Sequence, residues 1–239
     1  MSSANSVSHE IARCLRNEIL RGHYRVGERL SSERDLSTRF AASRGAVREA
    51  LLQLEQLGII SIQPGGVRVQ SINSASLAIL GPLMALNELP DGSIVDQFLQ
   101  VFGLLTSSTA KSSVEKASAE QLSHMQELVA KLAEQSEQSQ LVQVMPIKLL
   151  EYMTGVDDNL VLRLIGNDLK EHFVEQMLKV GVKPQLQLEV GPKLFKALSL
   201  SLAQKNGDAA AKAFQEYFDQ LRLSVMDALE LKKENYSQA

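Results

Sequence analysis

The apolar positions of residues 1–70 follow helical spacing three times and then change to a strand pattern. A first helix is predicted over residues 7–21, because apolar residues recur there at the spacing of one helical face: Val7, Ile11, Cys14, Leu15 and Ile19. Ser32, with Asp35 three residues later, predicts the capped start of a short second helix. Ser43 predicts the cap of a third helix, and Gly58 predicts its end.

A small β-hairpin is predicted directly after the third helix. The apolar residues Ile59, Ile60 and Ile62 favour a strand, Pro64-Gly65-Gly66 favours a turn, and residues 67–69 favour a return strand. Three helices closed by a hairpin form the winged version of the helix-turn-helix. We therefore predict a winged helix-turn-helix domain over residues 1–72, followed by a polar linker of small residues over 71–76.

The pattern of residues 73–239, the rest of the chain, predicts a single all-helical domain. Short loops are expected at Pro90-Asp91-Gly92, at Gly155, around residues 181–184 and at Asn206-Gly207, and a loop or fraying helix end over residues 134–140. Helices joined by short loops form a bundle. The fold class is therefore mostly α, with one small β-hairpin. The leucine-rich periodic stretches cover about 76–88, 93–110, 118–137, 139–154, 158–180, 188–205 and 207–232.

Composition and charge limit the classes of protein to which the chain can belong. The one cysteine, Cys14, excludes an internal disulfide, and the sequence has neither a secretory signal nor an apolar run near the ~20 residues of a membrane span. We therefore expect a cytoplasmic protein. Residues 1–70 hold ten arginines, no lysine and seven acidic residues, a net charge of +3, whereas the remainder carries −6. The positive charge of residues 1–70 suits a polyanionic partner, whereas the negative charge of the remainder does not.

The third helix carries the residues that favour DNA binding. Arg44 and Arg48 lie four positions apart, so they share a face near the helix start, where a recognition helix contacts base edges. Arginine suits guanine, and the Ser43 cap suits a phosphate. We expect contacts from the second helix and the wing as well. The predicted DNA-binding residues are Arg34, Ser43, Arg44, Gly45, Ala46, Arg48, Gly65, Gly66 and Arg68.

Each of these residues also has an ordinary structural interpretation. An arginine on an exposed helix is usually solvated, and Arg48 has Glu49 and Glu55 as neighbours with which it would pair. The DNA-binding hypothesis depends on the joint placement of the residues on one helix-turn-helix unit.

Residues 7–70 resemble the DNA-binding domain of the GntR family of bacterial regulators. The resemblance is carried by Leu30-Ser31-Ser32-Glu33-Arg34-Asp35-Leu36, by Ser43-Arg44-Gly45-Ala46-Val47-Arg48-Glu49-Ala50-Leu51, and by Leu54 through Gly58-Ile59-Ile60. It implies that Arg34, Arg44 and Arg48 contact DNA and that Gly65-Gly66 forms the wing tip. The wing sequence Pro64-Gly65-Gly66-Val67 is shorter than the common glycine-rich form.

Residues 73–239 are similar to the helical effector domain of the FadR subfamily. Many members hold a metal there with one Asp and three His, but the matching positions here are Gln143, Lys148, Lys196 and Asp219. The four histidines, His9, His23, His124 and His172, form no ligand pair at helical spacing. We therefore expect no metal and no other cofactor.

The effector is left open by the sequence. The acyl-CoA-responsive branch of the subfamily also lacks the metal site, and Tyr217 lies where that branch has a tyrosine. Tyr152 and Tyr217 are the predicted ligand-binding residues, and Lys148, Arg163 and His172 are candidate partners for an anion. Ordinary core packing is the alternative for the apolar members of this set. An acyl-chain pocket would be lined by Tyr152, Met153, Met177, Phe214, Tyr217 and Phe218.

The function expected from the sequence is a homodimeric transcription regulator that binds a palindromic operator in double-stranded DNA. A small-molecule effector, an acyl-CoA or an organic acid, would change its DNA affinity. An enzyme is the alternative, but the chain has no P-loop, Rossmann glycine pattern, Gly-x-Ser-x-Gly elbow or HExxH motif. The adjacent pair Asp157-Asp158 favours helix capping over catalysis. A second alternative is a winged helix that binds protein.

Overall fold

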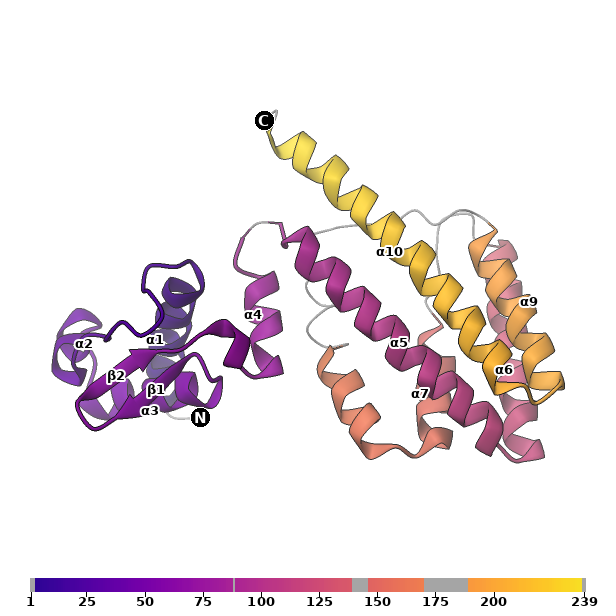
Figure 1. The fold of residues 1–239 in the computed structure, drawn as a ribbon, viewed down its shortest axis with the longest axis horizontal. Helices are drawn as coiled ribbons and strands as arrows, with labels where there is room; N and C mark the ends of the chain where they lie inside the picture. Colours follow the sequence, from indigo (N-terminus) through magenta and orange to yellow (C-terminus); the bar gives the residue numbers. More distant parts are fainter. Residues whose placement is uncertain (1–2, 88, 139–145, 170–188, 238–239) are drawn as a thin grey trace. The chain divides into compact units, whose positions relative to one another are not determined.

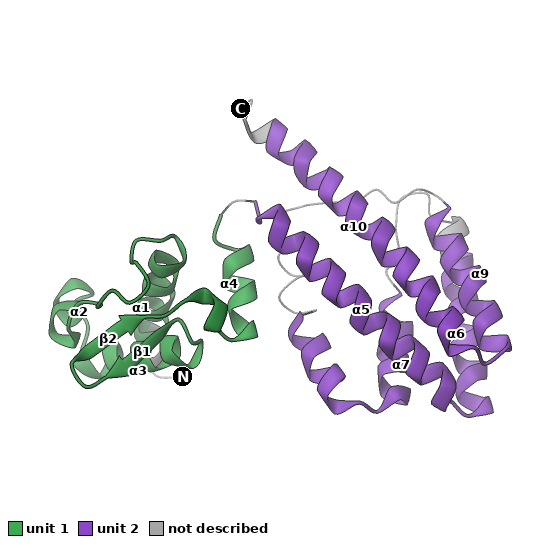
Figure 2. Cartoon of the chain, in the orientation of Figure 1, with its two compact units in different colours: residues 1–88 green, residues 89–239 purple. Residues whose placement is uncertain are grey.

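The computed structural model describes residues 3–87, 89–138, 146–169 and 189–237. The chain forms two compact units, residues 1–88 and residues 89–239, which Figure 2 shows in different colours. Contacts thus group residues 73–88 with the first unit, although the sequence suggested a domain boundary after residue 72.

The first unit is built around three helices, α1 (Ser3–Leu20), α2 (Glu33–Arg39) and α3 (Arg44–Gln56). Both predicted caps are confirmed, because the Oγ atoms of Ser32 and Ser43 accept the backbone N–H groups of Asp35 and Ala46, each at 3.2 Å. The apolar faces meet in one core, whose helical members are buried. They include Ile11, Leu15, Leu36, Val47, Ala50, Leu51 and Leu54.

The hairpin consists of β1 (Ile60–Gln63) and β2 (Gly66–Val69), paired antiparallel with Ile60 opposite Val69 and Gln63 opposite Gly66. Residues 28–30 extend this sheet, since the N–H of Leu30 donates to Val67 O at 2.9 Å. Because successive side chains of a strand point to opposite faces of the sheet, apolar side chains lie against the helices and polar side chains lie on the outer face.

Residues 71–76, predicted as a polar linker, are folded into ordered turns that pack on the first unit. The 3₁₀ turns η1 (Ile72–Ser74) and η2 (Leu77–Ile79) lead into the short helix α4 (Leu80–Met84). The N–H of Ser76 donates to Leu57 O at 2.9 Å, and Ile79 is buried in the core of the first unit. Polar composition was misleading here, because Ser71 and Ser76 cap these turns.

The described residues of the second unit form helices joined by loops, as Figure 1 shows. Helix α10 packs against α5 and α9, and α7 packs against α5 and α6. Helices α5 and α10 approach closely, since a Cβ atom on Gly103 would lie 2.9 Å from that of Phe218. The helices are α5 (Gly92–Lys116), α6 (Ala119–Gln138), α7 (Ile147–Asp157), α9 (Val190–Ala203) and α10 (Gly207–Ser237), with residues 160–169 helical between α7 and α9.

The predicted break at Gly155 is wrong, because Gly155 lies inside α7. The helix ends instead at Asp157, and the following residue, Asp158, has a left-handed φ of 53°, a conformation that a short polar side chain tolerates. Residues 134–138 belong to α6. The expected loop around residues 181–184 lies outside the described residues.

Asp157 does not cap a helix as the sequence suggested. Its side chain is buried and accepts a hydrogen bond from Lys116 Nζ at 2.9 Å. The pair thus joins the ends of α5 and α7, where Lys116 also donates to Asp157 O. Asn159 takes the capping role, since its Oδ1 accepts the N–H of Leu162 at 3.1 Å.

Among the helices in the described parts of the chain, none is both long and apolar enough to cross a lipid bilayer.

Candidate DNA-binding surface

The first turns of α3 present two cations on one exposed face. The opposite face is fixed by the buried residues Val47 and Leu51, so Arg44 and Arg48 are directed away from the core and are exposed. Ser43 is exposed as well, and its hydroxyl hydrogen is free to donate while its oxygen caps the helix. This helix start therefore has the charge and the polar groups that a DNA backbone or base edge requires.

Arg34 and the two α3 arginines have no ion-pair partner within the described residues. The suggested pairing of Arg48 with Glu55 is absent, because Glu55 Oε1 instead accepts the N–H of Ile62 at 2.6 Å and joins α3 to the wing. The three guanidinium groups are thus available to an external anion.

Arg39 has a structural role. Its guanidinium donates hydrogen bonds to both carboxylate oxygens of Glu18, and so joins α2 to α1. These hydrogen bonds lower the pKa of Glu18, and Tyr24 adds a weaker one at 3.3 Å. Arg39 therefore fixes α2 against α1 in the helix-turn-helix.

Ala46 is placed differently from its neighbours. It is 8% exposed and belongs to the core, and its N–H is already bonded to Ser43. Its small side chain therefore serves helix packing. Gly45 is exposed, and a Cβ atom there would meet only the Ser43 Oγ, at 3.8 Å, so the backbone at Gly45 lies at an open surface.

The wing tip requires glycine for conformational reasons. Gly65 has a φ of 103° and Gly66 a φ of 127°, which other residues rarely adopt. A Cβ atom on Gly66 would also collide with Arg29 Nε, so the Arg29 side chain lies directly on the backbone of Gly66.

Arg29 is a candidate that the sequence reasoning missed. It forms an antiparallel bridge with Arg68, so two arginines stand opposite each other on the outer face of the sheet. Arg68 Nη1 donates to Gly27 O at 2.9 Å, and neither arginine has a carboxylate partner in the part of the chain that the structure describes. Like charges in a cross-strand pair are destabilising, so this pair lowers the stability of the sheet and gives its outer face a positive charge.

The predicted effector residues do not share one pocket. Tyr217 lines a pocket of about 390 Å³ between α9 and α10, and burial raises the pKa of its hydroxyl well above the ordinary value. Tyr152 does not line that pocket, and its ring lies 4.5 Å from that of His124. Their role in ligand binding stays a prediction. His172 and Met177 lie outside the described residues.

The positions that would match the family's metal ligands carry no metal site that the structure describes. Lys148, Lys196 and Asp219 are exposed, and Gln143 lies outside the described residues. No group of three or more His, Cys, Asp or Glu side chains within the described residues is arranged to hold a metal ion.

Comparison with known proteins places this surface in a family. Residues 7–69 match the family model described as bacterial regulatory proteins, gntR family. The Uxu operon regulator of Haemophilus influenzae is 22% identical over 241 residues, which cover 93% of this chain and 83% of the relative. The repressor NanR of Escherichia coli is 33% identical over 127 residues, 52% of this chain and 46% of that protein.

The fold of the whole chain has a solved counterpart. The structure of Lar, which controls expression of the agr system of Listeria monocytogenes, aligns with a TM-score of 0.50 and 15% identity, covering 94% of this chain and 97% of Lar. The curated relatives are named as regulators, which disfavours an enzymatic function. Residues 7–69 are therefore a DNA-binding winged helix-turn-helix domain of the gntR family of bacterial regulatory proteins, in a chain whose relatives are named as transcriptional regulators.

Proposed function

We propose that the protein binds a palindromic operator as a homodimer and that an effector bound by the helical unit changes its affinity for that operator. The observation that carries the proposal is the exposed pair Arg44 and Arg48 on α3, without ion-pair partners among the described residues. Arg34 and the Ser43 hydroxyl would add phosphate contacts, and each α3 helix would read one half-site in the major groove.

The wing contributes through charge and backbone. Gly65 and Gly66 would bring the hairpin close to DNA, and Arg29 and Arg68 would bind a phosphate from the outer face of the sheet. Arg29 thus joins the set of residues proposed to contact DNA.

Exposed apolar side chains on two helices of the second unit support self-association. Leu104 on α5 is 53% exposed, and the helical residues Leu160, Val161 and Leu164 are 63%, 66% and 58% exposed. Exposed apolar patches commonly mark protein interfaces. A second copy of the chain is the partner that a two-fold symmetric operator requires.

The effector would act only if it binds the DNA-competent and DNA-incompetent states with different affinities. Tyr217, which is buried and lines the pocket between α9 and α10, is a proposed ligand contact, and Tyr152, which lies outside that pocket, is a second one. An acyl-CoA or an organic acid is the proposed effector class.

DNA binding by α3 is tested by two single substitutions measured on operator and on mixed-sequence duplex. We expect Arg44→Ala and Arg48→Ala each to weaken operator binding by about 1–3 kcal/mol and to reduce discrimination against the mixed sequence. Arg13→Ala is the matched control, because Arg13 is exposed on α1 and pairs with Glu10. If both α3 variants bind operator as the wild type does, α3 is not the recognition helix.

A further inference from the structure

Leu52 on α3 is exposed although its side chain is apolar. It is 46% exposed, whereas the other large apolar side chains of the helix, Val47, Leu51 and Leu54, are buried at 0%. Those three residues face the core of the first unit, and helical spacing directs Leu52 away from it. A single exposed leucine is common on protein surfaces, so its significance depends on its surroundings.

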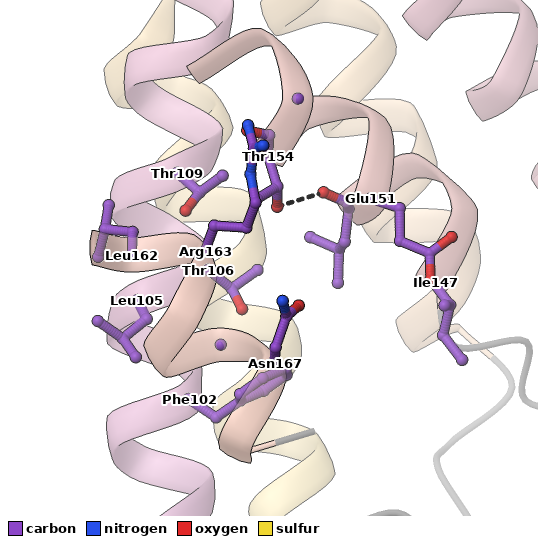
Figure 3. Close-up of a pocket in the computed structure, with 13 residues that line it drawn as sticks. Phe102, Leu105, Thr106, Thr109, Ile147, Glu151, Thr154, Leu162, Arg163 and Asn167 are labelled. Atoms are coloured by element: carbon purple, nitrogen blue, oxygen red, sulfur yellow. Dashed lines mark hydrogen bonds between the residues drawn. The ribbon is translucent and has the colours of Figure 1, made fainter. Parts of the chain in front are cut away.

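A pocket does not explain the exposure of Leu52. In the second unit, Leu105 and Leu162 line a pocket of about 400 Å³ between α5, α7 and the helical residues 160–169 (Figure 3). Leu52 lines neither that pocket nor the one beside Tyr217, and it belongs to the first unit. The neighbours of Leu52 on α3 therefore have to supply the explanation.

Those neighbours are the two arginines that carry the proposed DNA contacts. Arg44, Arg48 and Leu52 follow one another at intervals of four positions, so they form one row along the helix. Both arginines are exposed and have no ion-pair partner within the described residues. The positive charge of this row is complementary to DNA, and its apolar end faces the same way.

The length of the row fits the major groove. A helix rises about 1.5 Å per residue, so Leu52 lies about 12 Å along the axis from Arg44, and the major groove is about 12 Å wide. A helix that places both arginines against base edges would therefore bring Leu52 to the same groove.

We propose that Leu52 contacts the 5-methyl group of a thymine in each half-site of the operator. Thymine presents a methyl group in the major groove, and an apolar side chain is the contact that suits it. The contact would remove apolar surface of both partners from water, which is favourable. The inference rests on the proposed function and deepens it, because Leu52 would add a thymine to the guanines that the arginines recognise.

The first test removes the methyl group from the DNA. The duplex is the one that the full-length wild type selects from a random-sequence pool, and each thymine is replaced in turn by deoxyuridine, which lacks only the 5-methyl group. We expect one such replacement to weaken binding about fourfold in one half-site and about fifteenfold in both, the effect of one buried carbon group for each half-site. If no replacement weakens binding, the proposal is overturned.

The second test assigns the methyl contact to Leu52. Leu52→Ala should bind the thymine duplex about fifteenfold more weakly than the wild type does, and the two proteins should bind the deoxyuridine duplex about equally. Leu52→Met keeps an apolar side chain and should keep the preference for thymine. Equal weakening of both duplexes by Leu52→Ala would show that the side chain contacts something other than the methyl group, and would overturn the proposal.

Ile72→Ala is the matched control for this comparison. Ile72 is 43% exposed in the same unit but lies in η1, outside α3. The variant should keep the full dependence on the thymine methyl group. Loss of that dependence in Ile72→Ala would show that it does not arise from α3, which would also contradict the assignment to Leu52.

Arg44→Ala separates this inference from the proposed function. Arg44 and Leu52 are far enough apart for their effects to add, so Arg44→Ala should weaken binding to the thymine and deoxyuridine duplexes by the same factor. Weaker binding by Arg44→Ala without any effect of the methyl group on the wild type would leave the proposed function standing and remove the role of Leu52. A wild type that selects no duplex from the pool would overturn both.

Discussion

Ala41 occupies a conformation that suits a different residue. It lies in the turn between α2 and α3 with a φ of 47°, it is exposed, and a left-handed φ costs a residue with a Cβ atom roughly 1–2 kcal/mol. Glycine adopts that φ without strain but loses more entropy on folding. The turn of the helix-turn-helix is therefore strained at one position.

We expect Ala41→Gly to raise the free energy of unfolding by about 0.5–1 kcal/mol, as measured by urea denaturation. Ala42→Gly is the control, because Ala42 has an ordinary φ and packs against the core. That variant should lose about 0.5–1 kcal/mol. If Ala41→Gly is destabilising instead, the strain at this turn is smaller than the entropy difference.

The role of a residue was predictable from the sequence where the interaction that determines it forms between near neighbours in the chain. Ser43 was identified as a cap because its partner, the N–H of Ala46, lies three residues away. Arg29 was missed because its significance arises from pairing with Arg68, far along the sequence. Ala46 was assigned to the DNA-facing turn from its size, and helix periodicity from Val47 and Ala50 would have placed it nearer the core.

At the scale of elements, the wing sheet carries the two facing arginines. We expect Arg29→Ala to weaken binding to mixed-sequence duplex and to lower the slope of log affinity against log salt by about 0.9, the value for one lost phosphate contact. Phosphate contact carries no sequence information, so discrimination between operator and mixed sequence should stay the same.

The stability of the same variant is the control for a packing role. Removing one of two like charges in a cross-strand pair should leave the free energy of unfolding unchanged or slightly higher. An unchanged salt slope together with a loss of stability would show that Arg29 supports the wing only through its contact with Gly66.

The contact of α1 with α2 predicts a dependence on pH. Glu18 has a lowered pKa in the folded protein, so its pair with Arg39 adds stability above the unfolded pKa of about 4.3, and that stability is lost as the pH falls through the folded pKa. Glu18→Gln should therefore cost up to about 1 kcal/mol near neutral pH and progressively less below the unfolded value. Urea denaturation across this pH range measures the difference, with Glu10→Gln as the exposed control.

Element boundaries were predictable where a cap or a glycine defines them. Gly58 ended α3 as expected because its φ is 73° and the Ser74 carbonyl leaves no room for a Cβ atom. The end of α7 was misplaced at Gly155, since glycine inside a helix costs only about 1 kcal/mol and does not by itself stop one. The helix ends beside Asp157, whose ion pair with Lys116 joins helices far apart in sequence and could not be read from the local pattern.

At the scale of the whole molecule, the proposed dimer can be tested by charge on its candidate interface. We expect Leu104→Glu and Leu164→Glu to yield monomers by light scattering and to weaken operator binding, because a buried unpaired carboxylate is costly. Leu200→Glu on α9 is the matched control, as Leu200 is 54% exposed and lies on another helix. Dimers that persist in both variants would place the interface elsewhere.

The segment that follows the wing bears on how such regulators diversify. Because Ile79 is buried in the core of the first unit and Ser76 is bonded to Leu57, residues up to α4 belong physically with the DNA-binding half. A recombination event that joins this half to a foreign sensor must therefore cross over beyond codon 84 to leave the core filled. Gene fusions made at the polar stretch of residues 71–76 would replace Ile79, which fills that core, with a residue of the foreign domain. Few of these fusions would survive selection.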